Sequence, residues 1–382
     1  MRRWHINSLD RAVTPVNSPL DGCRRTLVAR LDNVGDVVLL GPALRAIRAV
    51  APRAHLGLLA SPAGATAAGV LPEIDEVIVA RVPWQDASAT PVFDPAAERL
   101  FIDRLASGRW DAILIFTSFS QTPFPAAYAA YLAGIPIRAG QASEFGGAML
   151  THQVAPAPWE AHQAERNLRL VEGLGVPVED RSLSIRIPSA ARSSVDALLA
   201  GQGVRPDEPT VVVAPGASCE ARRYAPDRYA AAGRELSRAT GARLVVVGSA
   251  KEANLIAPIV DAVSGAVSLV GRTTLPEFAA LVERAALVVC GNSAALHLAD
   301  ALRRPVVVLY SGTDLESQWQ PRHTASVVLR RETNCHPCYR FDCPFDMECL
   351  DIAPADVVAA GLRLLEVEGQ TVEEEPCAVS AS

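Results

Sequence analysis

The feature that most constrains the fold is an alternation of short apolar runs with helical patterns, which the chain goes through twice. The strand-like runs of the first half lie at 26–31, 55–60, 75–80, 111–116 and 135–139. Those of the second half lie at 210–214, 243–247, 267–270, 287–290 and 306–310. Such alternation is typical of a parallel sheet with helices on both faces. The sequence therefore predicts an α/β protein with two doubly wound units.

A stretch rich in proline and glycine, 176–209, separates the two halves. Because 382 residues suit two domains better than one core, we expect an N-terminal domain over 23–186 and a C-terminal domain over 187–366. The last helix is expected to end at Val367. We expect the N-terminal extension, 1–22, and the acidic tail, 367–382, to be disordered.

Composition excludes several classes of function. The net charge is −6 and aromatic residues make up only 5% of the chain, so neither a basic field nor a base-stacking platform for nucleic acid is expected. No apolar run approaches the roughly 18 residues that span a bilayer, and the first 22 residues lack the apolar segment of a secretory signal. These observations predict a cytoplasmic protein without a transmembrane segment.

Two tandem α/β units place a cleft between the carboxyl ends of their sheets. Four loops that follow strands carry polar groups toward that cleft, and they are 32–36, 215–224, 248–252 and 291–294. No GxGxxG motif follows the first strand and no Walker lysine is present, which argues against a dehydrogenase or a P-loop enzyme.

The loop after the strand at 287–290 is a candidate phosphate site. Asn292 and Ser293 follow Gly291 and precede a helical pattern. Asn and Ser are favoured N-caps, and the free amides of a helix start can bind a phosphate. The alternative is an ordinary strand–helix turn whose cap serves only the helix.

Five segments together resemble glycosyltransferase family 9, which contains the ADP-heptose:lipopolysaccharide heptosyltransferases. The segment 30–44 (RLDNVGDVVLLGPAL) resembles the N-terminal signature of that family. The segments 215–229, 271–277, 291–301 and 305–313 are similar to later motifs of the family and occur in the same order. The resemblance extends from about residue 26 to residue 365.

The resemblance implies a GT-B fold, in which two Rossmann-like doubly wound domains face a central cleft. It implies an inverting transfer, without a catalytic metal or other cofactor, of heptose or a related sugar from an ADP-heptose-like nucleotide-diphosphate donor. The implied acceptor is a glycolipid of the lipopolysaccharide core, or another cell-envelope glycan, at the membrane surface, with the enzyme cytoplasmic or peripheral to the inner face of the cytoplasmic membrane. The alternative is a nucleotide-sugar-binding protein or a nucleotide-sugar epimerase on the same two-domain scaffold, since fold alone does not fix function.

The resemblance also assigns residues to roles. Asp36 matches the base that deprotonates the acceptor hydroxyl. The residues that match or adjoin the donor-binding motifs are Arg222, Asn292, Ser293, Ala294 and His297. Glu252 is a further donor-binding candidate because it follows the strand at 243–247, where a carboxylate can accept from ribose hydroxyls as in dinucleotide sites. Simpler roles stay open: a first-turn acid for Asp36, a solvated cation for Arg222, a surface ion pair for Glu252 and a core or interface position for His297.

The sequence departs from the family pattern at the donor site. Asn292, Ser293 and Ala294 stand where the family has Asp-Thr-Gly, and Arg222 stands where it has Lys. These departures leave the donor sugar and nucleotide open, and the sequence names neither the acceptor nor the oligomeric state.

A cysteine cluster occupies the loop 335–349. Its members are Cys335, Cys338, Cys343 and Cys349. In a reducing compartment such spacing can hold a structural zinc ion. The alternative is four reduced thiols packed with neighbouring aromatic rings.

Overall fold

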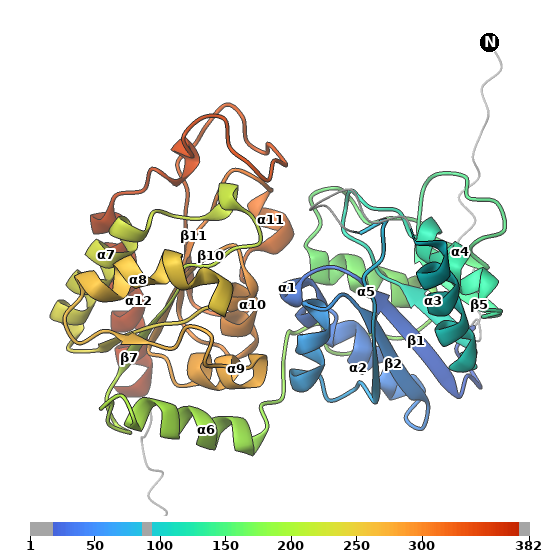
Figure 1. The fold of residues 1–382 in the computed structure, drawn as a ribbon, viewed down its shortest axis with the longest axis horizontal. Coiled ribbons are helices and arrows are strands. Elements are labelled where there is room, and N and C mark those ends of the chain that lie inside the picture. The colour runs from blue at the N-terminus through green and yellow to red at the C-terminus, as the bar shows by residue number, and fades with distance from the viewer. Residues whose placement is uncertain (1–17, 86–93, 374–382) are drawn as a thin grey trace, which may run out of the picture.

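The computed structural model of the protein describes residues 18–85 and 94–373, which form two lobes lying side by side (Figure 1). The first lobe is built on a sheet of six parallel strands in the order β3-β2-β1-β4-β5-β6. These strands are β1 (Arg25–Arg30), β2 (His55–Ala60), β3 (Glu76–Val79), β4 (Ala112–Ile115), β5 (Ile137–Gln141) and β6 (His152–Val154).

The second lobe repeats this plan with six parallel strands in the order β12-β11-β10-β7-β8-β9. Its strands are β7 (Thr210–Ala214), β8 (Arg243–Val246), β9 (Val267–Ser268), β10 (Leu287–Gly291), β11 (Val306–Leu309) and β12 (Ser326–Leu329). Numbered within each lobe, both sheets have the Rossmann order 3-2-1-4-5-6. The predicted pair of doubly wound units is confirmed.

This strand order fixes where a ligand can bind. In each sheet the direction of winding reverses between the first and fourth strands, so the crevice lies outside the carboxyl ends of β1 and β4 in one lobe and of β7 and β10 in the other. The strands β1, β7 and β10 are almost wholly buried, since their apolar residues pack on both faces of the sheets. The loops after these four strands therefore form the candidate site.

Helices cover the faces of both sheets. In the first lobe they are α1 (Val34–Val38), α2 (Gly41–Val50), the 3₁₀ helix η1 (Gly64–Val70), α3 (Pro95–Ser107), α4 (Phe124–Leu132) and α5 (Gln163–Gly173). In the second lobe they are α7 (Pro226–Thr240), α8 (Ala253–Ala262), α9 (Leu275–Glu283), α10 (Ala294–Ala301) and α11 (Glu316–Trp319). The helix α6 (Ser189–Ala200) packs against α9, and α12 (Pro354–Glu373) packs against α7.

The two lobes meet where α1 faces α10, at the junction seen in Figure 1. Gly35 allows this approach, because a Cβ atom at that position would lie 2.7 Å from Cδ2 of His297 and 3.7 Å from the Cα atom of Ala294. The helix that carries Asp36 and the helix expected to hold the donor are thus in direct contact.

Several expectations about elements were wrong. A single helix was expected over 37–50, but the structure has two, α1 and α2, separated at Leu39–Leu40. Pro42 explains the break, since its ring has no N–H and clashes with the carbonyl group four residues earlier. The helix expected over 63–70 is a 3₁₀ helix. The strands β6 and β12 and the helix α11 were not predicted, and both strands are sheet edges.

Both termini are more ordered than expected within the described residues. Residues 18–22 form a turn, and Leu20 is only 2% exposed in the core of the first lobe. The helix α12 continues to Glu373 instead of ending at Val367, since each added residue gains a backbone hydrogen bond and glutamate is a good helix former. The rest of the expected disordered segments, 1–17 and 374–382, lies outside the described residues. None of the helices in 18–85 and 94–373 combines the length and apolarity needed to span a bilayer.

Candidate functional site

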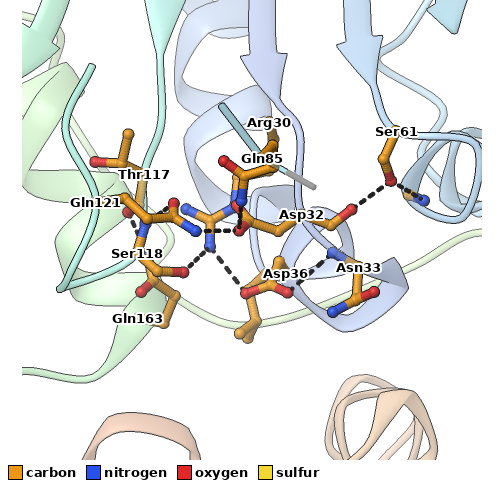
Figure 2. Close-up of polar contacts among 12 residues, drawn as sticks. Arg30, Asp32, Asn33, Asp36, Ser61, Gln85, Thr117, Ser118, Gln121 and Gln163 are labelled. Carbon is orange, nitrogen blue, oxygen red and sulfur yellow. Dashed lines mark hydrogen bonds and ion pairs between the residues drawn. The ribbon is translucent and has the colours of Figure 1, made fainter. Parts of the chain in front are cut away.

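Asp36 projects from α1 with both carboxylate oxygens held in place (Figure 2). Its Oδ1 accepts a hydrogen bond of 2.9 Å from Nη2 of Arg30, and its Oδ2 accepts one of 3.2 Å from the backbone N–H of Asn33. The side chain is 13% exposed. Each carboxylate oxygen can accept two hydrogen bonds, so the group can accept a further proton donor at the cleft.

Arg30 ends β1 and joins three side chains of the first lobe. Its guanidinium is fully buried and forms ion pairs of 2.9 Å with both Asp32 and Asp36. Its Nη2 also donates to Oγ of Ser118 in the loop after β4, at 2.8 Å. Because β1 and β4 are neighbours in the sheet, the residues that follow these two strands meet above their carboxyl ends.

Asp32 is the second carboxylate of this network. Its Oδ1 accepts 2.6 Å hydrogen bonds from the side-chain amides of Gln85 and Gln121. Burial raises the pKa of the Asp32 carboxyl above its usual range; Arg30 opposes this shift and Asp36 adds to it. One guanidinium therefore serves two carboxylates in a nearly dry environment.

Arg222 lies in the loop after β7 and is held in place by residues of the loop after β11. Its Nη2 forms a 2.6 Å ion pair with Asp314, its Nε donates to Thr313 at 2.9 Å, and its Nη1 donates to Ser218 at 3.2 Å. A guanidinium has five N–H donors, so two remain for a ligand. The alternative of a freely solvated cation does not fit, because the side chain is only 20% exposed.

Asn292 lies next to this cation at the end of β10. Its Nδ2 lies 3.3 Å from the Tyr310 hydroxyl and 3.5 Å from the same Asp314 oxygen that pairs with Arg222. The structure therefore brings Arg222 and Asn292 together. Ser293 occupies the N-cap position of α10, as expected, but its side chain makes no cap bond. Asn292 does not cap the helix, because its side-chain amide points toward Tyr310 and Asp314.

Glu252 lies in the loop after β8 and contacts Gly216 in the loop after β7. Its Oε2 accepts from both the N–H group and the hydroxyl of Ser249, at 2.7 and 2.9 Å. Its Oε1 packs against Gly216, since a Cβ atom added at that glycine would lie only 1.8 Å from this oxygen. This Oε1 has no hydrogen-bond partner among the described side chains. A carboxylate fixed on one oxygen and open on the other can accept a ligand hydroxyl.

Ala294 and His297 lie on the face of α10 that touches α1. The His297 ring is 5% exposed and 6.3 Å from the Trp319 ring, centroid to centroid. Burial lowers its pKa to about 4, so the ring is neutral near pH 7. This geometry makes His297 an interface residue, the simpler of the two roles considered from the sequence.

The cysteine-rich loop packs against the loop after β11, which holds Arg222. The N–H groups of Cys338 and Tyr339 donate to the carbonyl oxygens of Gly312 and Thr313, both at 2.9 Å. The Tyr339 hydroxyl also accepts from the indole N–H of Trp159 in the first lobe, at 3.1 Å. The loop thus links the residues that hold Arg222 to the opposite lobe.

The four clustered cysteines differ in exposure, from the exposed Cys335 to the buried Cys349. Within 18–85 and 94–373, no three His, Cys, Asp or Glu side chains are arranged to hold a metal ion. The zinc hypothesis therefore gains no support from this arrangement and stays a prediction.

Four residues that shape the site were missed from the sequence, namely Arg30, Asp32, Ser118 and Asp314. One signal was available, because Arg30 is a cation at the carboxyl end of an otherwise apolar strand. Asp32 lies in the loop 32–36, which was expected to face the cleft, so its place was predicted but not its role. Ser118 and Asp314 depend on which loops the strand order brings together, and no local pattern marks them.

Comparisons with known proteins identify the family and the fold. The model of glycosyltransferase family 9 (heptosyltransferase) matches residues 100–348. A family 9 glycosyltransferase from Veillonella parvula DSM 2008 is 20% identical, with a TM-score of 0.72, over 90% of this chain and 97% of that one. The E. coli ADP-heptose lipopolysaccharide heptosyltransferase II is 22% identical, with a TM-score of 0.71, over 90% and 99%.

The E. coli heptosyltransferase WaaC, solved with ADP, is 15% identical, with a TM-score of 0.60, over 92% of this chain and 99% of that one. A search among curated protein sequences found no match. The structural likenesses confirm the GT-B fold. Because the family model covers more than half of the sequence, the chain belongs to glycosyltransferase family 9, the heptosyltransferase family, and is a glycosyltransferase.

Proposed function

We propose that this glycosyltransferase is an inverting, metal-independent enzyme that moves heptose or a related sugar from a nucleotide-diphosphate donor to a cell-envelope glycan. One observation carries this proposal. A carboxylate, Asp36, and a cation with free N–H groups, Arg222, follow the first strands of the two sheets, and the lobes that carry them meet through α1 and α10.

In the proposed reaction an acceptor hydroxyl attacks the anomeric carbon of the donor sugar. The new C–O bond forms on the face opposite the departing phosphate, so the configuration inverts. The hydroxyl proton passes to Asp36, which acts as general base. The C–O bond to the nucleotide diphosphate breaks, and its electron pair leaves with the diphosphate.

The leaving group gains negative charge as this bond breaks. We assign its stabilisation to the two unused N–H groups of Arg222 and to the free amides at the start of α10, near Ser293 and Ala294. Asn292 and His297 support this surface from behind, since both are buried. Glu252 is proposed to accept from hydroxyls of the donor nucleotide, much as an acidic residue does in dinucleotide sites.

The proposed donor is ADP-heptose-like. One structural neighbour, the E. coli heptosyltransferase WaaC, has been solved both with ADP and with ADP-2-deoxy-2-fluoro heptose. These ligands support a nucleotide-sugar donor without identifying the sugar here. The C-terminal domain is proposed to bind this donor and the N-terminal domain the acceptor, since Arg222 and Asp36 lie on separate lobes.

We further propose a lipopolysaccharide-core or related glycolipid acceptor, reached at the inner face of the cytoplasmic membrane. The helix α4 supports this location. Its buried face carries only alanine, whereas Tyr128, Tyr131 and Leu132 are exposed and the helix has no charged residue. Tyrosine and leucine side chains on an uncharged helix face suit a membrane interface. The helix also begins shortly after Ser118, whose hydroxyl accepts from Arg30.

A donor and acceptor screen with purified protein tests this function. Nucleotide-diphosphate sugars are incubated with and without core oligosaccharide acceptors, and both nucleotide release and glycosylated product are measured. Acceptor-dependent release with product of inverted configuration is expected.

Retained configuration, or conversion of the donor sugar without transfer, would contradict the proposal. The second of these results is the one expected of an epimerase, and binding without release is the one expected of a nucleotide-sugar-binding protein.

A further inference from the structure

A single buried guanidinium lies between two carboxylates beside the proposed base. We propose that Arg30 and Asp32 are positioning residues: Arg30 orients the Asp36 carboxylate, and the negative charge of Asp32 strengthens that carboxylate as a base. This inference rests on the proposed role of Asp36.

The orienting role follows from burial and geometry. Arg30 is 0% exposed, so water cannot replace its hydrogen bonds. Its Nη2 bonds both Asp36 and Ser118, at 2.9 and 2.8 Å, which ties α1 to the loop after β4. With Oδ2 held by the N–H of Asn33, the plane of the Asp36 carboxylate is fixed relative to the sheet.

The charge role follows from counting the ionisable groups. Arg30 carries one positive charge and contacts two carboxylates, Asp32 and Asp36, so the trio is one negative charge in excess when both are ionised. Asp32 is kept in place by the amides of Gln85 and Gln121. A like charge nearby favours protonation of its neighbour, most strongly where water is scarce, so Asp32 favours transfer of the acceptor proton to Asp36.

Among the residues that the structure describes, few other charged groups lie near this trio. Arg166 on α5 lies close enough to Arg30 for the two cations to interact, and it is buried against the carbonyl groups of Pro158 and Trp159. His297 of α10 packs against Gly35 and is neutral. The helix η1, which packs on α1, carries no charged residue. Of the charges in 18–85 and 94–373, those of Arg30 and Asp32 therefore contribute most to the field at Asp36.

The pH dependence of kcat/KM tests the two roles separately. Asp32→Asn keeps the shape and removes the charge, so the acidic limb of the profile should move to lower pH by about one unit and the plateau rate should fall. Arg30→Gln removes the cation, so the limb should move to higher pH. Ser118→Ala is the matched control: it removes a neutral partner of Arg30 and should not move the limb.

Two further measurements cover variants that fold poorly or lack activity. Arg30→Lys keeps the charge but loses the fork that joins both carboxylates, so kcat should fall while the limb stays in place. Carbon-13 NMR of the aspartate carboxyl groups, with the Asp36 signal assigned by its loss in Asp36→Asn, reads the same titration without any turnover.

The results separate this inference from the proposed function. If the wild-type protein transfers no sugar, the function fails, and the NMR titration still decides whether Asp32→Asn makes Asp36 titrate at lower pH. If the acidic limb of kcat/KM and the titration of Asp36 lie at the same pH in the wild type, Asp32→Asn and Arg30→Gln, the inference is wrong, even in an active enzyme.

Discussion

Replacing Arg222 with alanine tests the donor side of the site most sharply. Three of its five N–H donors are taken by Asp314, Thr313 and Ser218, which leaves two for a diphosphate. A hydrogen bond to a charged group contributes about 1.5–3 kcal/mol, and part of that is lost to solvent at this partly open position. We therefore expect a loss of about 3 kcal/mol, or roughly 100-fold in kcat/KM, with kcat lowered as well.

The same substitution leaves the Asp314 carboxylate buried without its cation, which destabilises a fold by itself. The double variant Arg222→Ala/Asp314→Asn separates these effects, because the asparagine removes the unpaired charge. It should regain the thermal stability of the wild type but not its donor affinity. Arg238→Ala is the control, since that side chain is 75% exposed and pairs with its helix neighbour Glu235.

Steady-state kinetics of nucleotide release and calorimetric titration with the donor nucleotide give both quantities. Recovery of full activity in the double variant would show that Arg222 acts only through the fold. An Arg222→Ala enzyme that matches Arg238→Ala would place the diphosphate in a different loop. Arg223 is a poor control here, because the side chain is half-buried and its Nε lies in the interior.

Three further outcomes are expected. Burial lowers the pKa of His297 from 6.5 to about 4, so the unfolded chain binds a proton there more tightly and the free energy of unfolding falls as the pH drops from 6.5 toward 4. Urea unfolding at pH 7 and pH 5 should show that His297→Gln removes about 2 kcal/mol of this pH-dependent destabilisation. A variant with the same pH dependence as wild type would contradict the buried, neutral His297. The double variant Tyr128→Ser/Tyr131→Ser should co-sediment less with vesicles of phosphatidylethanolamine and phosphatidylglycerol than the wild type does. The control variant Phe341→Ser removes a similarly exposed ring from the other lobe and should not reduce co-sedimentation; equal effects of the two variants would refute docking through α4. EDTA should leave the rate of sugar transfer unchanged, since the negative charge of the leaving group is proposed to be stabilised by Arg222 and backbone amides. A rate that falls in EDTA and recovers when metal is added would refute this.

Much of the fold could be predicted because the parallel strands are buried on both faces and read as continuous apolar runs. The strand at 287–290 and the turn that follows it are one example, and the structure has β10 over Leu287–Gly291. The edge strands β6 and β12 were missed because each is short and partly exposed, so neither reads as a continuous buried run. The other two edges, β3 and β9, were predicted.

The site could be predicted only in part for a related reason. Asp36 and Arg222 lie within segments that resemble family motifs, so their positions were expected. Ser118, which bonds the Arg30 that holds Asp36, and Asp314, which pairs with Arg222, come from other loops. These loops meet because β4 lies beside β1 and because β10 lies between β7 and β11. Strand order is a property of the whole chain, and no spacing within one motif encodes it.

Asp36→Asn is the most direct test of the central claim that this carboxylate is the base. The asparagine keeps the size of the side chain and leaves Arg30 paired with Asp32, so the fold should persist. We predict that kcat falls by a factor of about 10² to 10⁴, the range for a lost general base, while the Kd for the donor nucleotide stays within about twofold of wild type. An Asp36→Asn enzyme that transfers sugar at the wild-type rate would contradict the account.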